Sequence, residues 1–182
     1  MSTFTQRMIG AAKLDVDIYE EVEADTSATG QAMTLVVLSS LAAGVGSFRE
    51  IGLAGVLLTS ILALGGWFIW AALTSLIGTK ILPEPQTESN VGELLRTLGF
   101  ASSPGLLRIF AFLPVVGPLL NFVVGVWMLI AMVVAVRQAL DYKGTGRAIG
   151  VCLIGWLVYI LVVNFAVFIL AGLGLVAGAA GG

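Results

Sequence analysis

Acidic residues form the densest group of chemically active side chains in this 182-residue sequence. Six of them lie between Asp15 and Asp25, and carboxylate oxygens are the ligands that calcium prefers. The segment lacks the glycine and the alternating ligand order of a calcium-binding loop. We therefore interpret it as a solvated acidic face and predict no metal site.

Most other groups that carry out chemistry are missing. The sequence contains no histidine, which is the commonest general base and metal ligand. Its single cysteine, Cys152, lies in an apolar stretch and is predicted to be a small buried hydrophobic residue. Neither a phosphate-binding glycine loop nor a serine nucleophile motif is present. We expect no catalytic residue and no cofactor, and hence no enzyme.

Composition indicates which solvent must surround these residues. The chain is 58% hydrophobic and 11% charged, with a mean hydropathy of +1.03, which is far more apolar than one small soluble core can accommodate. A membrane-crossing helix needs about 20 apolar residues. Five runs approach this length, and they are residues 31–48, 51–77, 98–116, 118–136 and 148–175. The sequence thus predicts an all-α polytopic membrane protein, with an arm (1–30) before a five-span domain (31–182).

Basic residues predict how this domain is oriented. Seven of the nine fall in the arm, in the linker near residues 80–96, or in the loop 137–147. Such residues are retained in the cytoplasm, so we expect a cytoplasmic N-terminus and an outside C-terminus. The net charge of -2 and the scattered lysines and arginines argue against a nucleic-acid partner.

Two boundaries leave alternatives open. The third run is interrupted at Ser102-Ser103-Pro104, so it forms either a full crossing or an interfacial helix from Val91 to Phe100 followed by a short dip. A full crossing places the basic residues of the loop 137–147 on the cytoplasmic side and is therefore favoured. In the second run, Gly65-Gly66 precedes Trp67 and Trp70. This pattern indicates either a helix that leaves the hydrocarbon near Trp70 or a kinked, tilted span.

Polar and small residues within the runs are candidates for helix contacts. Arg108 and Asn164 are the intramembrane polar residues that we single out, and Asn164 is expected to hydrogen-bond across helices. Small residues four apart allow helices to approach closely. Two such pairs, Ala42 with Gly46 and Gly174 with Gly178, predict packing either within one bundle or between copies.

The arm is expected to bind protein. Drawn as one amphipathic helix, it places Phe4, Met8, Ala11, Ile18, Tyr19 and Val22 on one stripe, with Asp15 as the exception. Its acids would be repelled by an anionic leaflet, so we predict that the stripe docks on a protein surface near the basic loop. The candidate partner-binding residues are Phe4, Met8, Asp15, Asp17, Tyr19, Glu20, Glu21, Arg137, Tyr142, Lys143 and Arg147.

Three segments resemble bacterial members of the Yip family of Ypt/Rab-interacting membrane proteins. They are 15–25 in the arm, the Leu-Leu-Arg-Thr-Leu-Gly-Phe-Ala stretch of 94–101, and the loop region 135–150. The resemblance implies five membrane helices, a cytoplasmic N-terminus, association with itself or with other membrane proteins, and location in the bacterial inner membrane. The eukaryotic Asp-Leu-Tyr-Gly-Pro motif is absent, and only Asp17-Ile18-Tyr19-Glu20-Glu21 stands in a comparable place. The resemblance therefore does not imply a GTPase partner.

Together these observations predict a non-enzymatic membrane protein that organises partners through its arm and loops. One alternative is an accessory subunit of a larger membrane complex, which the arm and the small-residue pairs would suit equally well. Another is a small transporter or channel. That class requires polar residues along a path, and Arg108, Asn121 and Asn164 are few for that purpose.

Overall fold

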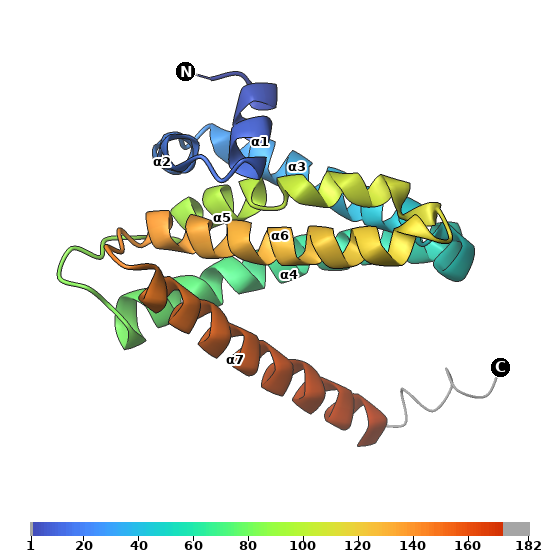
Figure 1. Cartoon of the computed structure of the whole chain (residues 1–182). Coiled ribbons are helices and arrows are strands. Elements are labelled where there is room, and N and C mark those ends of the chain that lie inside the picture. The colour runs from blue at the N-terminus through green and yellow to red at the C-terminus, as the bar shows by residue number, and fades with distance from the viewer. Residues whose placement is uncertain (1, 173–182) are drawn as a thin grey trace.

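The computed structural model describes residues 2–172 and consists of helices joined by short connections (Figure 1). Four of these helices are long and apolar enough to cross a membrane. The predicted all-α, membrane-type architecture is confirmed at this level. The predicted packing pair Gly174 and Gly178 lies outside the described residues.

The first two long helices form a hairpin. Helix α3 (Ala28–Gly46) and helix α4 (Phe48–Leu76) meet at Ser47. The helical backbone of α4 is broken at Gly52, whose φ of 62° is readily adopted only by glycine. Beyond this break α4 passes through Gly65, Gly66 and Trp70 without interruption and continues into the π-helical turn η1 (Ile77–Ile81), which ends before Pro83. The kink thus lies at Gly52 and not at the paired glycines.

The third apolar run does not form one α-helix. Helix α5 (Val91–Phe100) begins with a capping box between Asn90 and Glu93, and a 3-10 helix, η2 (Ser103–Phe112), follows it. Pro104 stands in the first turn of η2, where its missing amide hydrogen leaves no helical hydrogen bond unmade. Helix α5 thus has the bounds given in the disfavoured alternative of an interfacial helix followed by a short dip, and the run 98–116 is divided between α5 and η2.

Helices α5 and η2 run together beside α3, in the same direction. A methyl group on Gly99 would lie 2.6 Å from the Cβ of Ala32, near the start of α3. At the end of α3, a methyl group on Gly46 would lie 2.5 Å from the carbonyl oxygen of Arg108. Only glycine permits these close approaches. Gly46 thus lies at a close contact between α3 and η2.

The last two long helices run in opposite directions, the first toward the end of the bundle that carries the N-terminal helices and the second away from it. Helix α6 (Val116–Ala139) runs antiparallel to η2, and helix α7 (Thr145–Gly172) diverges from the bundle along its length (Figure 1). We call the end that carries α1, α2, the linker 82–90 and the loop 140–144 the arm end. The other end carries Ser47 and the turn 113–115, where Val115 is 88% exposed.

The arm forms two short helices and not the single amphipathic helix predicted. Helix α1 (Phe4–Ala12) and helix α2 (Val16–Ala24) are separated at Leu14, whose φ is 64°. Asp15, the exception in the predicted stripe, caps α2 by accepting a hydrogen bond from the backbone amide of Asp17. Its polar side chain therefore ends one helix and starts the next. The two helices pack on α5, η2 and α6 (Figure 1).

Candidate partner-binding surface

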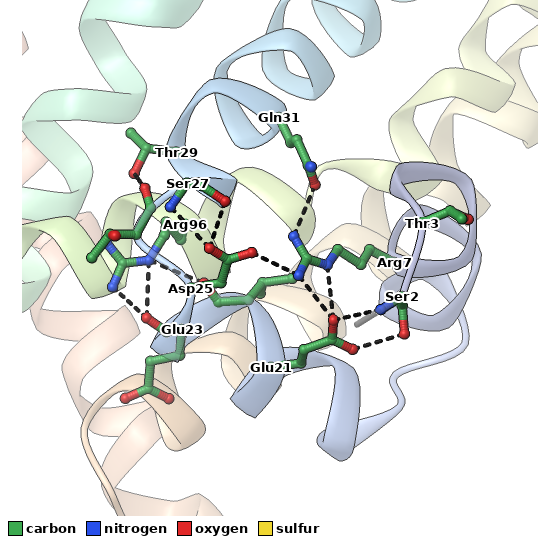
Figure 2. A network of polar contacts seen from close by, with 12 residues as sticks. Ser2, Thr3, Arg7, Glu21, Glu23, Asp25, Ser27, Thr29, Gln31 and Arg96 are labelled. Carbon is green, nitrogen blue, oxygen red and sulfur yellow. Dashed lines mark hydrogen bonds and ion pairs between the residues drawn. The ribbon is translucent and has the colours of Figure 1, made fainter.

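A buried arginine holds the arm together. Arg7 is only 2% exposed, and its Nη2 lies 2.9 Å from Oε1 of Glu21 and 2.7 Å from Oδ2 of Asp25. Its Nη1 donates to Oε1 of Gln31 in α3 at 3.1 Å (Figure 2). Charge-assisted hydrogen bonds of this kind are the strong ones. One guanidinium thus joins α1, the end of α2 and the start of α3.

Two carboxyl groups in this network stay ionised to low pH. Hydrogen bonds from the side chain and backbone of Ser2, and then from Arg7, lower the pKa of Glu21 to about 2. Hydrogen bonds from Ser27 and then Arg7 lower the pKa of Asp25 to about 2. Two of the six acids of the arm are therefore ion-paired with Arg7 in the folded arm.

A second arginine fastens the arm to the bundle. Arg96 of α5 is 6% exposed, and its Nε donates to the carbonyl oxygens of Val22 at 3.0 Å and Glu23 at 2.9 Å (Figure 2). These carbonyls belong to the last turn of α2, which has no intrahelical donors for them. A cation at a helix C-terminus also opposes the negative end of the helix dipole. Arg96 therefore caps α2 from a different helix.

Tryptophans make further links between backbones. The indole nitrogen of Trp127 in α6 donates to the carbonyl oxygen of Ala12 at the end of α1, at 2.8 Å. Trp67 of α4 donates to the carbonyl oxygen of Leu95 in α5, at 3.0 Å. The ring of Phe4 contacts that of Phe100 edge to face, with centroids 6.3 Å apart. The arm is thus packed against the bundle on its apolar side.

Five other acids gather in one hollow at the arm end. Its volume is about 620 Å³, and its carboxylates come from the arm, the linker, α5 and the loop. They are Glu20, Glu23, Glu88, Glu93 and Asp141. Within the described residues, no group of three or more acidic, cysteine or histidine side chains is placed to hold a metal ion.

Burial and crowding alter the titration of this hollow. Burial, then repulsion by Asp141, Glu93 and Glu20, raises the pKa of Glu23 to about 7, against a smaller opposing effect of Arg96. Burial and the nearby Glu93 and Glu88 also raise the pKa of Asp141. The hollow therefore becomes more negative as the pH rises toward and through 7.

The linker and the loop are joined beside this hollow. Arg147 Nε lies 3.3 Å from Oε1 of Glu84, and the backbone amide of Lys143 donates to Oε2 of Glu84 at 3.2 Å. The hydroxyl of Tyr142 donates to the carbonyl oxygens of Leu82 at 2.8 Å and Gly78 at 3.0 Å. Arm, linker and loop consequently form one continuous surface.

The predicted partner-binding residues fall into three groups, which are inward-facing, structural within the arm, and open to solvent. Tyr19 and Tyr142 are buried, and Phe4 and Met8 pack against the core, so these four side chains face inward. Asp15 and Glu21 serve the fold of the arm. The residues that remain open to solvent are Asp17, Glu20, Lys143 and Arg147, with Arg137 half-buried.

Among the described residues, no ion pair joins the acidic arm to the basic loop. Glu21 pairs with Arg7 inside the arm, while Arg147 pairs with Glu84 of the linker. Glu20 instead accepts a hydrogen bond from Gln138, near the end of α6 and beside the loop, at 3.0 Å. Arg7, which is nearer in the chain than the loop, pairs with Glu21 and Asp25.

Two intramembrane polar residues differ in their surroundings. Asn164 donates to the carbonyl oxygen of Ile160 in its own helix, at 2.8 Å, and not across helices as predicted. Arg108 lines two adjoining cavities between the helices. Ala42 is buried in α3, the helix against which η2 packs.

Arg7 and Arg96 were not singled out from the sequence. Arg7 lies three residues after Phe4 and four before Ala11, so its place on the apolar stripe was a usable signal that it would be buried. Arg96 offers no such signal, because its acceptors are more than seventy positions earlier in the chain.

The fold and this surface define a helical protein of membrane type with a folded arm packed on one end of its bundle. No protein-family model, curated protein or solved structure was found to match the chain.

Proposed function

We propose that this chain is a non-enzymatic integral membrane protein of Yip type, which organises protein partners in a bacterial cytoplasmic membrane through its arm end. The observation that carries the proposal is the continuous surface formed by arm, linker and loop. Buried arginines hold it together at two points, Arg7 and Arg96. Because two buried and hydrogen-bonded arginines fix the arrangement of these segments, the surface can present a constant shape to a partner.

The proposed topology has five crossings, the third made by α5 and η2. Helix α4 ends at the arm end and α6 begins at the other end, so the chain between them must traverse the bundle (Figure 1). Helix α5 spans about 15 Å and η2 about 20 Å, at the usual rises of α- and 3-10 helices. Their sum, about 35 Å, is comparable with the hydrocarbon thickness of about 30 Å.

Tryptophan positions support an arm end in the headgroup region and cytoplasm. A length of about 30 Å measured along α4 from Ile51 ends near Trp70, and tryptophans favour the membrane interface. Trp67, Trp70 and Trp156 line one cavity and so lie at a similar depth. The rest of α4, the η1 turn and the arm then project beyond the hydrocarbon.

The partner that suits the acidic hollow is a basic segment of another membrane protein. The five carboxylates of the hollow come from four parts of the chain, and the described lining contains no lysine or arginine that would neutralise them. Complementary charge steers association and suppresses wrong partners. The proposal predicts binding that weakens as salt rises.

Photocrosslinking in intact membranes tests this function. A photoreactive residue at Ala24, which is exposed and lines the hollow, should crosslink to a protein with a basic cytoplasmic segment. Glu20→Lys and Glu88→Lys should each lower the yield roughly threefold to tenfold, given the modest strength of exposed ion pairs.

Asp17→Lys provides the matched control, because Asp17 is an equally exposed acid outside the hollow. It should leave the yield unchanged. Equal effects of all three reversals, or crosslinks to lipid alone, would contradict a partner-binding surface. A crosslinked partner in fixed one-to-one ratio would instead favour the accessory-subunit alternative.

A further inference from the structure

The cavity beside Arg108 is separate from the arm end surface and differs from it in character. It has a volume of about 470 Å³ and is lined by residues of α3, α4, α5, η2, α6 and α7. Its walls are apolar and aromatic, and they include Trp67, Trp70 and Met128. A second cavity of about 370 Å³ adjoins it and shares Arg108 as part of its lining.

Two hydrogen-bond donors in this cavity lack acceptors. The Nε of Arg108 and the indole nitrogen of Trp70 are both buried, and neither has a hydrogen-bond partner among the described residues. None of the residues that line either cavity is acidic. Buried polar groups are nearly always satisfied, so two orphaned donors in one cavity point to a missing acceptor, and the charge of Arg108 favours an anionic one.

The cavity opens toward lipid. Leu129 and Trp156 belong to its lining and are 58% and 56% exposed on the outer surface of α6 and α7. Tyr159, which packs edge to face against Trp70 with centroids 6.4 Å apart, completes an aromatic rim. Aromatic side chains of this kind collect at the level of the lipid headgroups. An amphipathic molecule can therefore enter sideways, with its chains still in the bilayer.

We propose that this cavity binds an anionic phospholipid. The phosphate accepts hydrogen bonds from the guanidinium of Arg108, for which the planar arginine fork is well suited, and the Trp70 indole donates to a second polar oxygen of the same lipid. An acyl chain lies along Leu98, Leu129 and Met132. This site rests only on membrane insertion and is independent of any protein partner at the arm end.

Native mass spectrometry of the full chain, released from nanodiscs, tests the proposal. Discs of phosphatidylcholine alone are compared with discs that also contain phosphatidylglycerol. The wild-type chain should retain one phosphatidylglycerol in preference to phosphatidylcholine. Arg108→Gln should lower this preference about tenfold or more, as expected when a charge-assisted hydrogen bond is lost. Trp70→Phe removes only one N–H donor and should lower it roughly twofold to tenfold.

Control variants show whether the preference for the anionic lipid arises at this cavity. Arg49→Gln alters an exposed arginine at the other end of the bundle and should change nothing. Arg108→Lys keeps the charge and should retain part of the preference. If Arg108→Gln fails to fold, Trp70→Phe and Arg108→Lys still decide the matter. Displacement of the lipid by millimolar inorganic phosphate would identify a site for a free anion and overturn the proposal, as would equal retention of both lipids by the wild type.

Discussion

Replacement of Arg96 by methionine should release the arm while leaving the bundle folded. Methionine keeps a long unbranched side chain but provides no hydrogen-bond donor. In the wild-type structure the Arg96 guanidinium donates hydrogen bonds to the carbonyl oxygens of Val22 and Glu23 in the last turn of helix α2. The variant leaves both carbonyls without their donor at the same time.

The size of the effect follows from these two acceptors. Hydrogen bonds to charged groups contribute about 1.5 to 3 kcal/mol each, and the two carbonyls share one guanidinium, so together they account for about 2 to 4 kcal/mol. This value includes the smaller favourable interaction with the helix dipole. At about 1.4 kcal/mol per tenfold, the opening equilibrium of the arm should rise about 30- to 700-fold.

Hydrogen exchange followed by mass spectrometry measures this opening directly. Peptides covering 16–25 should lose protection by that factor, because exchange of α2 amides reports local opening. Peptides from α6 should not change. The matched control is Arg137→Met, since Arg137 is half-buried and donates to Tyr142 of the loop and not to the arm. Unchanged protection of α2 in Arg96→Met would refute the capping role.

Three further predictions concern the acidic hollow, the topology and helix packing. Glu23, whose pKa is raised to about 7, stabilises the docked arm while protonated, so docking should weaken as the pH rises from 5 to 8. Glu23→Gln should remove this dependence in Trp127 fluorescence, while the low pKa values of Glu21 and Asp25 should loosen the arm only below about pH 4. A reporter active only outside the cytosol should work when inserted at Gly117 and fail at Gly144; activity at both or neither would contradict the five-crossing topology. Gly99→Ala should lower the thermal stability of the purified chain, because its methyl group meets Ala32 at 2.6 Å. Gly30→Ala, which meets nothing within 4 Å, should raise helix stability by up to about 1 kcal/mol, and equal effects of the two would argue against close packing.

The long helices could be predicted from the sequence because their causes are local. A bilayer supplies no hydrogen bonds to the backbone, so each long apolar run must form a helix whatever surrounds it. The end of α4 follows from Pro83, and the start of α5 from the spacing of Asn90 and Glu93. These features depend on residues only a few positions apart.

The arm and the cavity depended on tertiary structure. The sequence suggested an amphipathic stripe but not that the backbone would turn at Leu14, because both halves pack on segments far away in the chain. The acceptors of Arg96 lie more than seventy residues earlier in the chain. Likewise, Trp70 and Arg108 line one cavity only because α4 and η2 both pack against α3. Composition and spacing thus determined which segments form apolar helices. Packing between distant segments decided that Arg7 and Arg96 have hydrogen-bond acceptors, while Nε of Arg108 has none among the described residues.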